Sequence, residues 1–391
     1  MTLPRSVPFL LLLFTGTLSG SMVVPYMGFF LVEGLGHEPW VISIYAGAVA
    51  ILVVVLNRAF ARRMDGGAPA FAMIGVAALG SLLAAGSLAL SPTLGVVLTV
   101  GVAGFGAGAS ALSTMFSLGV AVAGRSGIRT TTFNATMRAT TSTAWMIGPA
   151  VSFVVADRLG PAAVFDVVAV VALAWVALWW TVTPREAAPG GARAPGTASG
   201  APRDVALWIA GAFVGCLAGA HFLTFTALPL FLVGEVGLPG HAPGHAFTVK
   251  TAVEVAAIAT TPLLIARIGL RRSLLGTAAL AVGAILFLAS VRSYGQMLAG
   301  AALEGLYYGL FSTLAIGWVQ SLAPDRPARA TAVYWNATMV TSVLAGPAAG
   351  LIAQGTDFRT VILVGAGVAV LALTILVAGG LHPQMREAEA T

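Results

Sequence analysis

Charged residues are scarce in this sequence, and that scarcity is the first constraint on what the protein is. Asp, Glu, Lys and Arg make up 9% of the 391 residues, whereas a soluble domain carries about 25% so that its surface can face water. Hydrophobic residues make up 58%, and the mean hydropathy is +0.94. Most of the surface must therefore face hydrocarbon, which predicts a membrane protein and excludes a soluble enzyme.

The residues that pumps and enzymes need are also few or wrongly spaced. The single cysteine, Cys216, excludes an internal disulfide, and we expect it to pack. The only lysine, Lys250, follows Val249, so no phosphate-binding loop of an ATP-driven pump is present. The five histidines lack zinc-site spacing, and no GxSxG motif occurs. The glycines of 101–108 follow no strand, which favours helix packing over dinucleotide binding. We expect no metal, no cofactor and no enzymatic activity.

The basic residues have an uneven distribution that predicts topology. Nineteen of the 20 are arginine, and most fall in alternate short loops. With a cytoplasmic N-terminus, fifteen lie on the cytoplasmic side and only Arg158, Arg292 and Arg359 lie outside. This asymmetry follows the positive-inside rule and places both termini in the cytoplasm. The net charge of +6 therefore reflects topology, and we expect no nucleic-acid partner.

Apolar runs of about 20 residues, long enough to cross a bilayer, recur along the whole chain. We read the first as a retained helix and not as a signal peptide, because its apolar stretch continues through Leu31. Residues 184–203, rich in Pro, Gly, Ala and Arg, predict a cytoplasmic linker between an N-terminal six-helix bundle (1–183) and a C-terminal one (204–391). The runs lie near 8–32, 40–60, 69–90, 94–121, 131–156, 162–182, 204–233, 246–266, 274–291, 296–322, 331–354 and 361–380.

The two halves resemble each other in sequence. The tetrapeptide NATM occurs at 134–137 and again 202 residues later. Two further landmarks recur in the same order at nearly the same offset, and many secondary transporters are built by such internal duplication. These pairs are Gly148-Pro149 with Gly346-Pro347, and Pro25 with Pro229.

Ionisable groups inside a bilayer are costly, so the few that occur there are candidates for function. Lys250 and Glu254, one helical turn apart, share a face and can form a structural salt bridge, or Glu254 can carry a proton. Glu304 is either a second proton carrier or a hydrogen-bonded acid. For His221 we favour packing or substrate contact over proton transfer. The N-terminal half contributes only Arg138.

Rings and amides in the predicted helices suggest a polyhydroxylated cargo, which needs both stacking and hydrogen bonds. The alternative is that these residues are lipid-facing or core side chains. The candidate substrate-binding residues are Tyr26, Asn134, Trp145, His221, Phe225, Tyr307, Tyr308, Trp335 and Asn336, and Trp318 and Gln320 have the same character.

Two bundles of six helices joined by a cytoplasmic linker resemble the major facilitator superfamily. The loop ARIGLRRS at 266–273 is similar to that superfamily's Asp-Arg-x-Gly-Arg-Arg motif, with Ala266 in place of the acid. The loop after the second run is degenerate. By this resemblance the loop residues Arg267, Gly269, Arg271 and Arg272 form a gating or structural motif. We assign the same kind of role to Gly148 and Pro149 and to their repeat, Gly346 and Pro347.

A narrower resemblance is to the bacterial sugar efflux transporter family. It rests on MRATTSTAWMIGPAVSF at 137–153, LPLFLVGEVGLPG at 228–240 and the stretch from Thr248 through Glu254. By this resemblance Arg138, Trp145, Gly148, Pro149 and Glu254 occupy family motif positions. Ala227 stands where family members carry an acid, and they tend to lack one at Glu304, so we expect Glu304 to take an ionisable role.

The resemblance implies proton-driven export of a small sugar or glycoside-like solute from the cytoplasm by alternating access. We expect a monomer in the bacterial inner membrane, with protons, the cargo and lipid as partners. Arg138, Lys250, Glu254 and Glu304 are the candidate proton-coupling residues, and we expect Arg138 to pair with ionised Glu254. The alternatives are export of a drug or secondary metabolite by the same scaffold, and a membrane receptor without transport.

Overall fold

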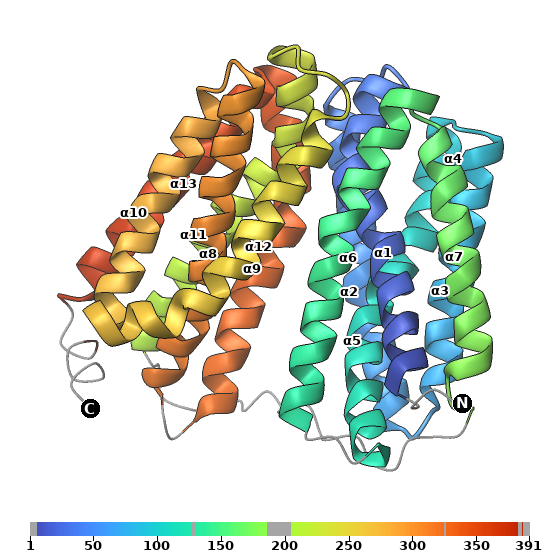
Figure 1. Cartoon of the computed structure of the whole chain (residues 1–391), viewed down its shortest axis with the longest axis horizontal. Helices are drawn as coiled ribbons and strands as arrows, with labels where there is room; N and C mark the ends of the chain where they lie inside the picture. The colour runs from blue at the N-terminus through green and yellow to red at the C-terminus, as the bar shows by residue number, and fades with distance from the viewer. Residues whose placement is uncertain (1–5, 127–129, 186–204, 324–325, 382–384, 386–391) are drawn as a thin grey trace. The chain divides into compact units, whose positions relative to one another are not determined.

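The computed structural model describes residues 6–126, 130–185, 205–323, 326–381 and 385, and within these ranges every regular element is a helix (Figure 1). The all-α membrane fold predicted from the sequence is confirmed. The chain divides into two compact units: unit 1 comprises Met1–Arg193 with Pro239–Gly244, and unit 2 comprises Ala194–Leu238 with His245–Thr391.

Unit 1 is built from the first nine helical elements. Short π-helical segments, here labelled η, extend the end of α1 and join α4 to α5. The elements are α1 (Ser6–Phe29), η1 (Phe30–Gly34), α2 (Trp40–Asp65), α3 (Ala70–Leu90), α4 (Leu94–Val96), η2 (Val97–Gly101), α5 (Val102–Arg125), α6 (Thr130–Leu159) and α7 (Ala163–Val182).

Unit 2 contains six long helices and one π-helical segment. They are α8 (Val205–Leu230), η3 (Phe231–Glu235), α9 (Ala242–Ile268), α10 (Leu270–Ala289), α11 (Tyr294–Ser321), α12 (Pro327–Gly355) and α13 (Phe358–Gly379).

Eleven helical spans among the described residues are long and apolar enough to cross a membrane. They correspond to eleven of the twelve apolar runs. The remaining run, 296–322, forms α11, which is 28 residues long but does not reach the same hydropathy. Polar side chains, Glu304 among them, account for the difference. Candidate functional residues thus lie on α11, the long helix that is not among these eleven spans.

The duplication inferred from sequence reappears as shared irregularities of the backbone. The π-helical segments η1 and η3 start 201 residues apart, at Phe30 and Phe231, and each extends a helix that contains an internal proline. Gly36 and Gly237 follow them with φ of +71° and +76°, a conformation that a side chain would strain. Both halves thus use the same local solution to end their first helix.

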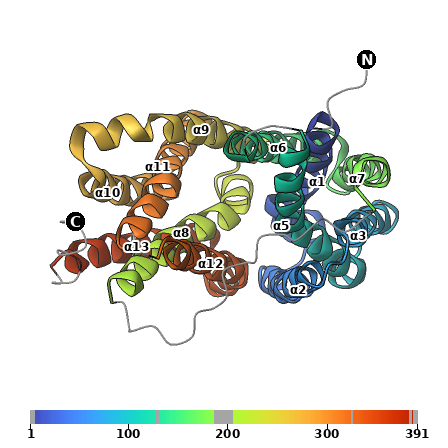
Figure 2. The ribbon, with the colours of Figure 1, turned by 90° about the horizontal axis from the view of Figure 1, so that it is seen from below.

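Packing within unit 1 centres on α1 and α3. Helix α1 packs against α5, α6 and α7, and α3 packs against α5 and α7 (Figure 2). Trp175 of α7 is almost fully buried and lies against Gly16 of α1, where any Cβ would overlap the indole ring. Small residues on one helix thus receive large rings from its neighbour.

In unit 2 the corresponding central helix is α8, which packs most extensively against α12 and α13 (Figure 2). Helix α10 packs against α11 and α13. Phe213 of α8 meets Phe311 and Trp318 of α11 in edge-on contacts, with ring centroids 6.2 and 5.5 Å apart. These apolar contacts hold α8 and α11 together beside the polar side chains described next.

Candidate functional site

Polar and aromatic side chains gather in unit 2 where α8, α9 and α11 meet. We call this set the α8–α9–α11 cluster. Its members are His221 of α8, Lys250 and Glu254 of α9, and Glu304, Tyr307 and Tyr308 of α11.

The charges on α9 compensate each other within one turn. Lys250 Nζ donates to Glu254 Oε2 at 2.6 Å, and their side chains are 8% and 20% exposed. Lys250 Nζ also lies 4.7 Å from the centre of the Tyr308 ring, a cation–π distance. The ammonium is therefore held between a carboxylate and an aromatic face, which lowers the cost of keeping both charges within the membrane.

A second acid lies deeper in the cluster and has less compensation. Glu304 has no exposed side-chain surface, and its Oε1 is 3.1 Å from Nδ1 of His221, which is 3% exposed. The contact has the distance of an ion pair but not the alignment of a hydrogen bond. The atoms His221 Nδ1, both Glu304 oxygens and the Tyr307 hydroxyl are all buried without a hydrogen-bond partner among the described residues.

Tyr308 connects the two pairs. Its ring stacks on the His221 imidazole with centroids 3.6 Å apart and planes 19° apart. Phe225, one turn after His221, contacts the His221 ring at 5.9 Å and the Phe247 ring of α9 at 4.7 Å. The cluster thus joins two acids, two nitrogen bases and a partly buried aromatic surface.

Glycines on α11 allow this close approach. A Cβ at Gly305 would lie 2.1 Å from the Lys250 carbonyl oxygen, and one at Gly309 would lie 2.5 Å from the Glu254 carbonyl oxygen. Because only glycine fits at both positions, the backbone of α9 rests on α11 at the two residues that carry its charges.

Comparisons with known proteins find relatives along nearly the whole chain. No family model matches the chain. It is 26% identical to Sugar efflux transporter B of Salmonella typhimurium over 91% of both chains. It is 25% identical to Sugar efflux transporter A of Dickeya chrysanthemi over 89% of both, and 26% identical to Sugar efflux transporter A of Escherichia coli over 93% of both.

The chain is thus similar over about nine tenths of its length to sugar efflux transporters, which supports membership of that family of the major facilitator superfamily. The crystal structure of the nucleoside transporter NupG superposes on 96% of this chain and 99% of its own with a TM-score of 0.79 at 14% identity, which shows the shared fold. The protein is therefore a multi-pass membrane transporter of a small molecule and not an enzyme.

The candidate residues in unit 1 of the transporter differ in how far they are buried. Tyr26 is fully buried, its hydroxyl donates to the Pro161 carbonyl at 2.7 Å, and its ring packs edge-on against Phe153. These contacts favour a packing role, and substrate binding by Tyr26 stays a prediction. Asn134 and Trp145 of α6 are half-buried, and Arg138 is exposed.

Gly148 lies at the closest approach of α6 and α1. A Cβ there would be 2.1 Å from Ser21 Oγ, and Ser21 Oγ itself donates to the Ala144 carbonyl at 2.9 Å. Pro149 follows inside α6. In unit 2, the corresponding Gly346 and Pro347 lie within α12 and are half-buried.

Other candidates in unit 2 lie outside the cluster. Trp335 and Asn336 are exposed on α12, and the Trp335 side chain is 43% exposed. In the loop motif, Gly269 has a φ of +82°, and Arg271 donates to the Leu376 carbonyl near the end of α13 at 3.5 Å. That places a guanidinium at a helix C-terminus, where the helix dipole favours it. Arg267 and Arg272 are exposed.

Sequence reasoning missed the parts of the site that depend on packing. It did not single out Gly305 and Gly309, although their spacing is the small-x-x-x-small pattern of close membrane helices. It also missed Phe247, whose ring completes the aromatic surface next to Phe225. Nothing in the sequence marks Phe247 apart from the other phenylalanines.

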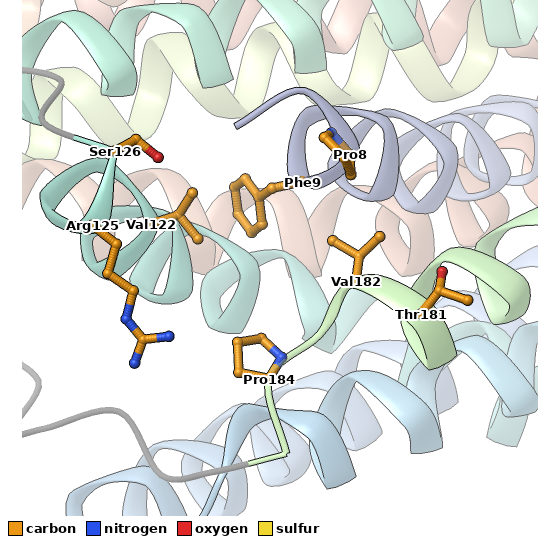
Figure 3. Close-up of a pocket in the computed structure, with 8 residues that line it drawn as sticks. All are labelled: Pro8, Phe9, Val122, Arg125, Ser126, Thr181, Val182 and Pro184. Carbon is orange, nitrogen blue, oxygen red and sulfur yellow. The ribbon is translucent and has the colours of Figure 1, made fainter. Parts of the chain in front are cut away.

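Unit 1 also has a cavity of about 460 Å³ where α1, α5 and α7 approach one another. Among the residues that line it, Figure 3 shows the Phe9 ring between Val122 and Val182, with Arg125 and Pro184 nearby. None of the residues that line it was a sequence-predicted site residue. We assign it no part in cargo binding.

Proposed function

We propose that this transporter exports a small sugar or glycoside-like solute from the cytoplasm in exchange for protons. The observation that carries the proposal is the α8–α9–α11 cluster, in which ionisable and aromatic side chains lie together inside membrane-spanning helices. Such groups are costly in a membrane and mark substrate and ion pathways. The names of the relatives, which are sugar efflux transporters, support the cargo class and the direction.

The cluster has the chemistry that a sugar requires. A sugar ring offers C–H faces for stacking and hydroxyls for hydrogen bonds. Phe225 and Tyr308 are half-buried rings, and Glu254 is a carboxylate with part of its surface exposed. Ligand sites combine an apolar lining with a few polar groups of this kind. We propose that these residues contact the cargo, and that Asn134, Trp145, Trp335 and Asn336 stay candidates for further contacts.

Coupling to protons would use the acids of unit 2. Glu254 is paired with Lys250 on its own helix, so loss of its charge on protonation would release the ammonium. Arg138 belongs to unit 1 and remains a proposed partner for ionised Glu254. We further propose a monomer in the bacterial inner membrane with both termini cytoplasmic, working by alternating access.

The test uses the purified protein in proteoliposomes with a labelled sugar, a labelled thioglycoside and a labelled hydrophobic drug. We expect an imposed pH gradient to drive uphill movement of the sugar or thioglycoside. Glu254→Gln should lose gradient-driven transport while exchange of cargo down its own gradient continues, because the amide keeps the shape and cannot take up a proton.

Two controls complete this test. Glu38→Gln, on an exposed loop residue of unit 1, should transport like the wild type. If only the hydrophobic drug moves, drug export replaces the sugar proposal. If Glu254→Gln moves cargo uphill at the wild-type rate, Glu254 is not a coupling residue.

A further inference from the structure

We propose that His221 and Glu304 together bind a single proton inside unit 2, at a site separate from Glu254. Binding of the shared proton depends only on the contacts between α8 and α11. Its role in transport rests on the proposed function, since only an exchanger of protons for cargo needs such a site.

The surroundings of Glu304 exclude an isolated carboxylate. Its side chain has no exposed surface, and neither oxygen accepts a hydrogen bond from any part of the chain that the structure describes. An ionised carboxylate that has lost its water and gained no donor is strongly unfavourable. His221, with Nδ1 3.1 Å from Glu304 Oε1, is the base that can share a proton with it.

Two arrangements satisfy both side chains, and they contain the same number of protons. Glu304 can be a neutral carboxylic acid beside a neutral imidazole, or a carboxylate beside an imidazolium. The proton moves from Oε1 to Nδ1 between them, and the pair stays neutral overall. Removing that proton leaves one buried negative charge, and the Lys250 ammonium beside the Tyr308 ring is already paired with Glu254. The Tyr307 hydroxyl, one turn from Glu304 and also without a partner, can donate to that charge but cannot neutralise it.

The groups around His221 and Glu304 supply no charge that could replace the shared proton. Lys250 and Glu254 of α9 neutralise each other, and the hydroxyls of Tyr307 and Tyr308 carry no charge. On α12, the Tyr334 hydroxyl donates to the Ser312 carbonyl. The charged residues that α10 and α13 contribute within their described lengths lie near their first turns: Arg271, Arg272 and Arg359.

Lys250 supplies the link to cargo. Its ammonium lies 4.7 Å from the centre of the Tyr308 ring, and that ring stacks on His221 at 3.6 Å. When cargo hydroxyls bind Glu254, the Glu254 carboxylate neutralises less of the Lys250 charge. The positive charge of Lys250 then disfavours a proton on His221 and Glu304. Cargo binding would then expel the proton, as exchange requires. Glu254, which is 20% exposed and has an ammonium at 2.6 Å, is the acid open to cargo, and the buried pair holds a proton of its own.

The decisive measurement is the infrared difference spectrum of the purified protein between acidic and alkaline pH, which needs no cargo. In the wild type we expect loss of one buried signal, either a carboxylic acid band or an imidazolium ring band. Glu304→Gln should lack it, because an amide neither binds the proton nor compensates an imidazolium. The matched control, Glu254→Gln, should retain it.

His221→Asn provides a second variant if Glu304→Gln does not fold. It keeps Glu304, and the carboxylic acid band should then titrate at a different pH from the wild-type signal. An unchanged spectrum in Glu304→Gln, or an unchanged titration in His221→Asn, would overturn the shared site.

Transport by the same variants tests the role of the pair in the cycle. In proteoliposomes, Glu304→Gln should keep cargo exchange and lose all accumulation driven by a pH gradient. The double variant Glu304→Gln with His221→Asn should show the same cargo exchange and the same loss of accumulation as Glu304→Gln alone, because both residues bind one proton. Wild-type gradient-driven accumulation in Glu304→Gln would remove the pair from the cycle. If the wild type moves none of the tested sugars, the proposed function fails, and the infrared result still decides the proton site.

Discussion

Single side chains complete the start of α13, where backbone amides have no partner within the helix. The Glu235 carboxylate accepts hydrogen bonds from the amides of Phe358 at 2.6 Å and Arg359 at 3.2 Å. Asp357 Oδ1 accepts from the Thr360 amide at 2.7 Å. Three of the four free amides of a helix N-terminus are thus satisfied, and a negative charge lies where the helix dipole favours it. Through Glu235, the end of η3 is tied to the start of α13.

Replacing Asp357 should show the value of one cap and its pH dependence. We expect Asp357→Ala to lower the free energy of unfolding by about 0.5–2 kcal/mol. Asp357→Asn should lower it much less, because an asparagine oxygen can also accept the hydrogen bond from the Thr360 amide. Hydrogen bonds from Thr360 hold the pKa of Asp357 below its usual value. The carboxylate's contribution is therefore full above about pH 4 and is lost as the pH falls through the lowered pKa.

Thermal unfolding in detergent at neutral and acidic pH measures this effect. The gap between wild type and Asp357→Ala should narrow in acid. Equal midpoints at neutral pH would contradict the capping role.

At the scale of helices, glycine sets which elements can meet. Gly305 and Gly309 bring α11 against the backbone of α9, and in unit 1 a Cβ at Gly104 of α5 would lie 2.1 Å from the Gly80 carbonyl of α3. Membrane helices gain little from hydrophobic exclusion, because lipid is as apolar as their side chains, so close van der Waals packing decides their contacts. The α9–α11 contact matters for function because it positions Lys250 and Glu254.

Gly305→Ala tests this contact. The alanine Cβ would overlap the Lys250 carbonyl oxygen, so α9 must move away from α11. This movement takes the Lys250 ammonium away from the Tyr308 ring. We expect a lower thermal midpoint and slower cargo exchange. The matched control on the same helix is Gly317→Ala, where nothing lies within 4 Å of the new Cβ.

The control should fold as well as the wild type or slightly better, since alanine favours a helix over glycine by about 0.5–1 kcal/mol. Wild-type stability and transport in Gly305→Ala would show that the helices meet elsewhere.

For the whole molecule, the two units share a plan but differ in chemistry. Each has a central first helix that ends in a π-helical segment and a glycine of positive φ. Of the five ionisable residues predicted inside membrane helices, four lie in unit 2 and only Arg138 lies in unit 1. The two units share a fold, and the titratable groups predicted inside membrane helices are concentrated in one of them.

Topology is the prediction that belongs to this scale. Reporter fusions near Gly196, a position outside the described residues, should be cytoplasmic, and fusions near Pro239 should be periplasmic. The physical reason is the concentration of arginine in alternate loops, which are retained on the cytoplasmic side. Alkaline phosphatase and fluorescent-protein fusions report the two sides in living cells. The reverse pattern would overturn the orientation and the proposed direction of export.

What the sequence determined by itself is what depends on composition and on neighbours along the chain. Scarce charge and recurring apolar runs predicted a membrane protein of long helices, and the motifs predicted its similarity to sugar efflux transporters. The contact between Lys250 and Glu254 also follows from local spacing, because residues four apart share a helix face.

Tertiary structure decided which helix faces meet. The few polar residues of α8 form no continuous stripe, so its sequence does not tell its core side from its lipid side. His221 and Glu304 are 83 residues apart, and only packing brings them to 3.1 Å and removes them from water. The same holds for Gly305 against Lys250, and for Tyr26, which the fold turns into the interior of unit 1. In lipid both faces of a helix are apolar. The sequence therefore indicates which residues are candidates, but only the packing of one helix against another decides which side chains contact each other.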